Sequence, residues 1–197
     1  MKKAFFFLFV TLIISCNRET TFSEVNVNDR YTILIPTYMK PCNDIQKDAS
    51  LQYQNLEKDI YAIVIDEKKI TMQDYDLNFN LDTYYNNISS QGFSESIKNG
   101  KISIPGRQEI NGNKALVADI TGKLEDNDVY YKFAVVETPY EFYQILTWTR
   151  ASHREKLEKD MVKMIESFKE LKHPAEELPS PKLSDSVTIQ QNWGSAK

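Results

Sequence analysis

Cysteine, histidine and glycine are all scarce in this sequence, and each shortage excludes a class of protein. Among 197 residues there are two cysteines and six glycines, which exclude a scaffold held by several disulfides and a collagen-like chain. The two histidines, His153 and His173, lie at opposite ends of a predicted helix about 30 Å long, so they cannot share a metal ion. We therefore predict no metal site and no cofactor.

Basic residues are outnumbered by acidic ones. The chain has 24 lysines and arginines against 28 aspartates and glutamates, which gives a net charge of -4. A broad nucleic-acid surface needs clustered lysine and arginine, so no nucleic-acid partner is predicted. The sequence also lacks a Gly-x-Ser-x-Gly elbow and a glycine-rich phosphate loop, and no catalytic residue is predicted.

Bulky apolar residues, in contrast, are plentiful. Hydrophobic residues make up 41% of the chain and charged residues 26%, and there are eleven tyrosines and ten phenylalanines. These proportions are typical of a soluble globular domain with a well-packed core. The length suits one domain with short appendages.

The first sixteen residues carry the clearest signal in the chain. Lys2 and Lys3 precede an apolar run, residues 4–14, in which only Thr11 is polar. The run is shorter than the ~20 apolar residues that span a bilayer. A charged start followed by a short apolar stretch is typical of a secretory signal.

The end of this segment, Leu12-Ile13-Ile14-Ser15-Cys16, resembles the lipobox of bacterial lipoproteins. The resemblance implies cleavage before Cys16, a lipid thioether on its sulfur and acylation of its new amino group. It also implies a protein anchored by lipid in the cell envelope, at the outer membrane if the cell is Gram-negative. An ordinary secretory signal with a chance cysteine is the alternative. After cleavage Cys42 would have no partner for an intramolecular disulfide, and we expect a packed, unreactive thiol there.

Alternating or two-sided apolar segments predict strands at residues 31–36, 51–55, 60–65, 107–110, 114–121, 129–137 and 141–149. Asn111-Gly112 has the composition of a type I′ turn between two of these strands. Asp66 and Glu67 are interpreted as a solvated strand end whose side chains point to opposite faces, not as a catalytic pair. The acidic loop 125–128 lacks the glycine and the distal glutamate of known calcium loops.

Apolar residues at helical spacing predict two helices. The first spans residues 77 to about 90, and the second begins at a predicted capping box of Ser152 and Glu155. The apolar stripe of the second helix extends to Leu171. Beyond Lys172, three prolines in a polar segment predict a disordered tail.

Short links between successive strands require antiparallel pairing, and strands that are apolar on both sides need cover on both faces. The sequence therefore predicts an α+β fold, an α/β/α sandwich with a central antiparallel sheet flanked by helices. The predicted organisation is a signal peptide at 1–15, a tether at 16–21, a domain at 22–172 and a disordered tail at 173–197.

The order of these elements resembles the PsbP-like fold. The resemblance rests on the strand ending in Ile35-Pro36, the Ile110-Asn111-Gly112 hairpin, the aromatic strand at 143–148 and Ser167-Phe168-Lys169 near the end of the last helix. It covers residues 22–172 and implies that fold. Because PsbP-like proteins mostly serve as non-catalytic binding or assembly modules, the resemblance also favours such a role. It implies no functional residue.

Aromatic residues gather on and beside the strands at 129–137 and 141–149, and Trp193 stands alone in the tail. Most are expected to pack in the core, because aromatic residues favour strands. Tyr130, Tyr140 and Trp193 are the candidate contacts for a ligand or partner. The leading hypothesis is a lipid-anchored envelope protein that binds a protein partner without chemistry. A small-molecule or glycan binder with an aromatic-lined groove is the alternative, and a hydrolase that uses scattered carboxylates is a third.

Overall fold

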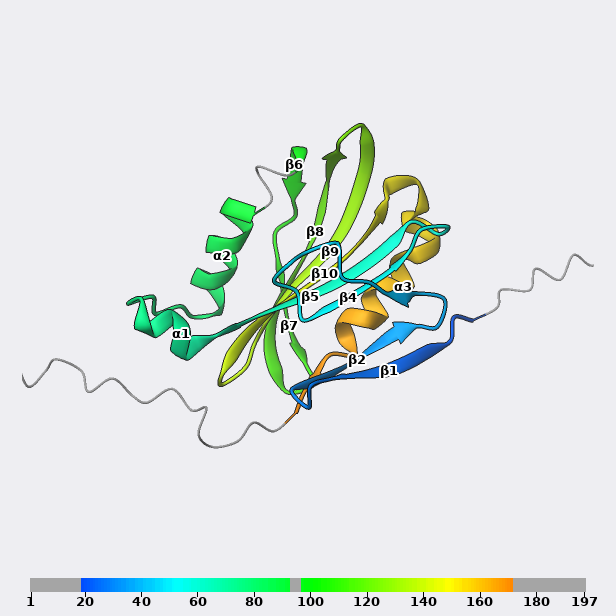
Figure 1. Ribbon diagram of the computed structural model, residues 1–197. Coiled ribbons are helices and arrows are strands. Elements are labelled where there is room, and N and C mark those ends of the chain that lie inside the picture. The colour runs from blue at the N-terminus through cyan, green and yellow to red at the C-terminus, as the bar shows by residue number, and fades with distance from the viewer. Residues whose placement is uncertain (1–18, 93–96, 172–197) are drawn as a thin grey trace, which may run out of the picture.

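The computed structural model describes residues 19–92 and 97–171, which form two antiparallel sheets and three α-helices (Figure 1). The strands are β1 (Phe22–Val27), β2 (Tyr31–Pro36), β3 (Lys40–Pro41), β4 (Leu51–Asn55), β5 (Ile60–Lys68), β6 (Lys98–Ile102), β7 (Gly106–Ile110), β8 (Asn113–Leu124), β9 (Asn127–Glu137), β10 (Glu141–Arg150) and β11 (Lys169–Glu170). The helices are α1 (Lys69–Asp74), α2 (Leu81–Gly92) and α3 (Arg154–Glu166), and a 3₁₀ turn, η1 (Ala151–His153), precedes α3.

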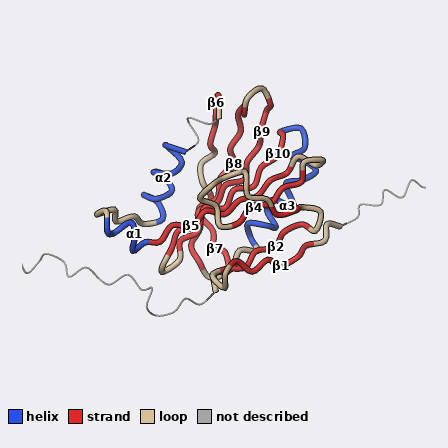
Figure 2. Tube along the Cα trace, viewed as in Figure 1, coloured by secondary structure: helices blue, strands red, loops and turns tan. Residues whose placement is uncertain are grey.

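The large sheet has eight strands in the order β3-β4-β5-β10-β9-β8-β6, and β7 also pairs with β8. The small sheet has the order β1-β2-β11. The small sheet and α3 cover one face of the large sheet, and α2 lies on the other face (Figures 1 and 2). The predicted antiparallel sheet flanked by helices is therefore confirmed. One covering layer differs from the prediction, because it combines a helix with a three-stranded sheet.

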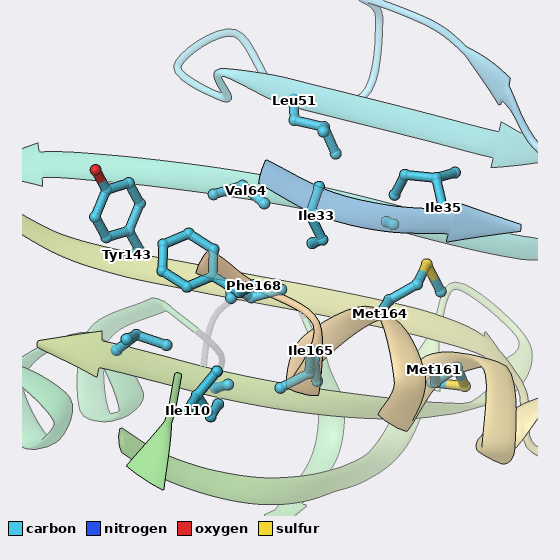
Figure 3. Close-up of a cluster of buried hydrophobic side chains, with 14 of the residues drawn as sticks. Ile33, Ile35, Leu51, Val64, Ile110, Tyr143, Met161, Met164, Ile165 and Phe168 are labelled. Carbon is cyan, nitrogen blue, oxygen red and sulfur yellow. The ribbon is translucent and has the colours of Figure 1, made fainter. Parts of the chain in front are cut away.

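The large sheet has a hydrophobic cluster on each face because its central strands are apolar on both sides. On β10, Tyr143 and Ile145 belong to the cluster beneath α3, whereas Phe142 and Leu146 belong to the cluster beneath α2. Figure 3 shows the first cluster, in which residues of the small sheet and α3 point toward the large sheet. Each fully buried side chain of this size contributes about 1.5–3 kcal/mol.

All seven predicted strands occur, and the turn chemistry is as expected. Asn111 and Gly112 both have positive φ, 48° and 89°, which is the type I′ geometry that lets Ile110 pair with Asn113. The strand predicted at 60–65 extends to Lys68. Asp66 and Glu67 therefore lie within β5, and the prediction of a solvated strand end is wrong.

The helix boundaries differ from the prediction. Helix α2 begins at Leu81, and Leu77 lies outside it with 46% of its surface exposed. The reason is a cap that sequence analysis missed. The Asn80 side chain accepts a hydrogen bond from the Thr83 N–H, and the Thr83 hydroxyl oxygen accepts one from the Asn80 N–H, each at 2.9 Å.

The predicted capping box at the start of α3 is also wrong. Ser152 lies within η1, so the helix starts at Arg154, and His153 occupies the N-cap position without a side-chain cap hydrogen bond. The apolar stripe itself is confirmed through Phe168, which lies beyond the helix and is fully buried.

The predicted tether is partly attached to the domain. The Thr20 hydroxyl donates to an Asp160 carboxylate oxygen at 3.0 Å, and the Thr21 and Thr37 hydroxyls are 2.6 Å apart. The predicted signal peptide at 1–15, Cys16 and the predicted tail at 173–197 lie outside the described residues. Within residues 19–92 and 97–171, none of the helices has the length and hydrophobicity to cross a bilayer.

Replacing Asn80 by alanine tests the cap of α2. We expect Asn80→Ala to lower the free energy of unfolding by about 1 kcal/mol, because the Thr83 N–H loses its acceptor. Asn86→Ala is the matched control: Asn86 is exposed within α2, so alanine should stabilise the helix by a few tenths of a kcal/mol. Urea unfolding measures both effects, and equal effects of the two substitutions would contradict the assignment.

Candidate functional site: an aromatic groove at one end of the large sheet

Three aromatic side chains stand side by side on the α2 face of the large sheet. Trp148 of β10 lies directly opposite Tyr61 of β5 and Tyr131 of β9 in the strand register. The Trp148 ring centroid is 5.1 Å from that of Tyr61 and 5.4 Å from that of Tyr131, and the ring planes differ by 11° and 19°. The rings are therefore stacked, and each contact stabilises the sheet by about 0.5–1.5 kcal/mol beyond the area it buries. We call these three residues the aromatic row.

Helix α2 packs over a different part of the same face. Tyr84 stacks on Phe142 with ring centroids 4.1 Å apart, and Tyr85 lies 5.6 Å from Phe133. Phe142 is six residues from Trp148 along β10, a distance of about 20 Å. Trp148 is half-buried. The space beside it is bordered by the loop between β3 and β4 and by the tip of the β8–β9 hairpin, and not by α2.

A groove of about 340 Å³ opens beside Trp148. One wall is Ile45, from the loop between β3 and β4, and another is the tip of the β8–β9 hairpin. The lining residues are Ile45, Asp59, Tyr61, Leu124, Glu125, Asn127, Val129, Trp148, Thr149 and Arg150. This volume is at the small end of the range for ligand pockets, so the groove suits one large side chain or a small molecule.

An ion pair forms the polar rim of the groove. The Arg150 Nε atom is 2.5 Å from a carboxylate oxygen of Asp59, and the arginine side chain is 55% exposed. The turn before β5 holds Asp59, with a φ of 56° and its carbonyl oxygen 2.6 Å from the Thr149 hydroxyl. Burial and a hydrogen bond to Asp59 raise the pKa of Tyr61.

The lining of the groove combines apolar surface with a charged rim. Its lining includes neither histidine nor cysteine, and the Asp59 carboxylate is engaged by Arg150. In the described parts of the chain, no three or more His, Cys, Asp or Glu residues are grouped so that they could hold a metal ion. An apolar row with an ion pair at its rim provides contact area and an orienting polar contact.

Tyr130, a predicted contact residue, lies on the opposite face of the sheet and is fully buried. Its hydroxyl donates to Glu158 at 2.7 Å and lies 3.1 Å from Asp119, and the Arg154 guanidinium is 4.1 Å from its ring centre. Hydrogen bonds from Arg154 and Tyr130 lower the pKa of Glu158 to about 2. Tyr130 thus holds a charged cluster together, and it has no exposed surface for a partner.

The structure does not bring Tyr140, another predicted contact residue, close to Tyr130. Tyr140 is half-buried in the bend before β10, whereas Tyr130 pairs with Thr149 at the far end of that strand. Trp193 and Cys16 lie outside the described residues, and their roles stay predictions. Trp148 belongs to the aromatic strand predicted at 143–148, but the sequence does not indicate Tyr61 as its neighbour, because only the strand register brings these two rings together.

A second cluster, of charged groups, ties the small sheet to the large one. Arg30, in the hairpin between β1 and β2, donates to Asp66 of β5 and to Glu141 of β10. Glu141 is 1% exposed and Asp66 is 12% exposed. Burial alone would lower the pKa of Arg30, but the hydrogen bonds to the two carboxylates reverse the shift and raise it. We call these three residues the Arg30 cluster.

Glu67 and Cys42, which the sequence analysis also considered, are both partly buried within the domain. Glu67 points to the face opposite Asp66, as predicted, and its carboxylate accepts a hydrogen bond from Gln144 at 3.3 Å. Burial raises the pKa of Glu67. Cys42 is free and half-buried, and burial together with Asp44 raises the pKa of its thiol, which disfavours the reactive thiolate.

The fold has solved counterparts, although no family model and no curated protein matches the sequence. Cyanobacterial PsbP (CyanoP) from Synechocystis sp. PCC 6803 matches with a TM-score of 0.57 at 13% identity, over 80% of this chain and 98% of that one. The fold is PsbP-like. LpqN of Mycobacterium tuberculosis, which is involved in cell envelope biogenesis, matches with a TM-score of 0.54 at 10% identity, over 79% of this chain and 94% of that one. At such identities the likeness shows the fold alone.

Replacing Arg30 by methionine tests the Arg30 cluster. We expect Arg30→Met to lower the free energy of unfolding by about 3 kcal/mol, because Asp66 and Glu141 then face each other without a cation. Arg107→Met is the matched control, since the Arg107–Asp82 pair is exposed and should contribute well under 1 kcal/mol. Adding Glu141→Gln to Arg30→Met should recover part of the loss. Equal effects of the two methionine substitutions on thermal unfolding would contradict this account.

Proposed function

We propose that the protein is a lipid-anchored, non-catalytic binding module of the bacterial cell envelope that engages a protein partner at the groove beside Trp148. The observation that carries the proposal is the aromatic row, where a half-exposed tryptophan lines a groove of about 340 Å³. Aromatic residues that a partner fully desolvates supply much of the binding energy at protein interfaces.

The orientation of the rings favours a protein partner over a sugar. Carbohydrate rings bind by stacking on an open aromatic face. In the row, the Trp148 ring lies between Tyr61 and Tyr131, so both of its faces are already stacked. The row therefore presents ring edges to the apolar groove. This arrangement suits an apolar side chain that inserts from a partner.

A small molecule or glycan is the second candidate, and one observation favours it. Tyr61 stands at the end of the row, so one of its ring faces is not stacked on Trp148, and the Asp59–Arg150 ion pair lies nearby. A single sugar could stack on that face and hydrogen-bond to the ion pair. The contact would be smaller than one that fills the groove.

The anchoring part of the proposal rests on the lipobox that ends at Cys16. The PsbP-like fold is compatible with it, since LpqN, a protein of this fold, is involved in cell envelope biogenesis. Cleavage before Cys16 would remove Lys2 and Lys3 and change the net charge of the chain from -4 to -6. An anionic bilayer would repel such a chain, so the attachment would depend on the lipid.

Removing the lipid acceptor tests the anchor. We expect Cys16→Ala to move the protein from the membrane fraction to the soluble fraction of lysed cells, because acyl chains are the only strong membrane attachment proposed. Cys42→Ala, which removes the other cysteine, should leave the protein in the membrane fraction. A Cys16→Ala protein that stays membrane-bound after an alkaline wash would overturn the anchoring claim.

Groove variants test the binding site. In cross-linking of intact cells followed by pull-down, Trp148→Ala and Leu124→Asp should each reduce recovery of the partner at least tenfold. Leu124 is 38% exposed at the groove, so this second variant leaves the aromatic row intact. Tyr75→Ala changes a tyrosine that is 76% exposed and does not line the groove, so it is the matched control and should leave recovery unchanged.

Two results would contradict the proposal. Full recovery of the partner with both groove variants, each shown to be folded by circular dichroism, would remove the groove from the interaction. A thermal shift with an oligosaccharide that is lost in Tyr61→Ala would establish the second candidate instead, since a ligand stabilises by RT ln(1 + [L]/Kd).

A further inference from the structure

Strand β1 is the outer strand of the small sheet, and β2 is its only neighbour in the described part of the chain (Figure 1). It lies apart from the groove, because the small sheet covers the opposite face of the large sheet. An outer strand has one row of backbone N–H and C=O groups that face away from its sheet.

The register identifies which residues carry these outward groups. The Thr37 N–H donates to the Thr21 carbonyl oxygen at 2.9 Å, in line with the pairing of Phe22 with Pro36. Because hydrogen-bonded and non-hydrogen-bonded pairs alternate in an antiparallel ladder, Ser23, Val25 and Val27 bond to β2. The backbone groups of Phe22, Glu24 and Asn26 therefore point outward. Pro36 agrees with this parity, since it has no N–H to donate to Phe22.

The other outer strands have features that disfavour the addition of another strand. Strand β3 has two residues, one of which is Pro41, and β11 also has two. Strand β6 contains Lys98 and Lys101 with a register shift between them, and β7 contains Arg107, which is paired with Asp82 of α2. Strand β1 has six residues without lysine, arginine, proline or a register shift. It is thus the open edge among the described strands.

The charge around β1 selects the kind of strand that would add. Glu19, Glu24 and Asp29 are exposed, and residues 19–29 contain no basic side chain. Arg30, the next residue, is directed to Asp66 and Glu141. A second copy that used all three outward residues in an antiparallel pair would place Glu24 opposite its own equivalent, and like charges at opposed positions are destabilising.

We propose that β1 binds an extended segment of a partner protein by strand addition, with a lysine or arginine of that segment opposite Glu24. The backbone groups of Phe22, Glu24 and Asn26 supply the hydrogen bonds, and the acidic edge supplies the preference for a basic strand. This site is independent of the groove, so either one stands if the other fails.

Residue-resolved hydrogen exchange of the whole mature chain tests the site directly. In the free protein, the amides of Ser23, Val25 and Val27 should exchange slowly and those of Phe22, Glu24 and Asn26 rapidly. The probe is the peptide acetyl-Thr-Val-Thr-Lys-Thr-Val-Thr-amide, which should slow exchange of the three outward amides at least tenfold. The same peptide with glutamate in place of lysine should bind at least tenfold more weakly.

Two substitutions at one position separate the backbone from the charge. Glu24→Pro removes an outward N–H that β2 does not use, so the fold should persist while binding of the lysine peptide is lost. Glu24→Gln keeps the N–H and removes the charge, so both peptides should bind with nearly equal affinity. If Glu24→Pro does not fold, Glu24→Gln and the exchange pattern still decide the matter.

Three results would overturn the proposal. The lysine peptide could leave exchange at Phe22, Glu24 and Asn26 unchanged, or bind Glu24→Pro as tightly as the unaltered protein. Slow exchange of the outward amides in the free protein, together with a dimer in analytical ultracentrifugation, would instead show that a second copy occupies the edge.

Discussion

The structure depends on the burial of β10 on both faces. This strand alternates residues of the two hydrophobic clusters, with Tyr143 and Ile145 on one side and Phe142 and Leu146 on the other. Neither face can be left in water, so the sheet needs two covering layers. Helix α2 packs over Phe142 but does not border the groove at Trp148, six residues further along the strand. The groove thus follows from the incomplete cover of one face.

On the opposite face the cover is a sheet, and this difference also has consequences. A helix satisfies its backbone groups internally, whereas a small sheet must end in an outer strand. The Arg30 cluster fixes that sheet to β5 and β10 through two carboxylates, one of them almost fully buried. The same arginine is thereby engaged by two carboxylates, and residues 19–29 beside it carry only acidic charged side chains.

Much of the fold could be predicted from the sequence, because its signals are local. The two-sided strands required both covering layers, and Asn111-Gly112 specified its turn. The small sheet was missed because β1 alternates weakly and β11 has only two residues, which tertiary pairing alone defines as a strand. The candidate site was harder to predict from the sequence. Trp148 and Tyr61 are 87 residues apart, and no sequence signal gives the register that stacks them.

The two proposed surfaces place different demands on a partner. The groove would take a side chain into an apolar space, whereas the β1 edge would take a backbone and is largely indifferent to side chains other than the one opposite Glu24. If Cys16 carries the lipid, five residues separate it from Phe22, and these six Cα-to-Cα steps reach about 20 Å. The edge would then lie close to the bilayer. A partner that uses this edge would therefore have to present its basic strand close to the membrane surface.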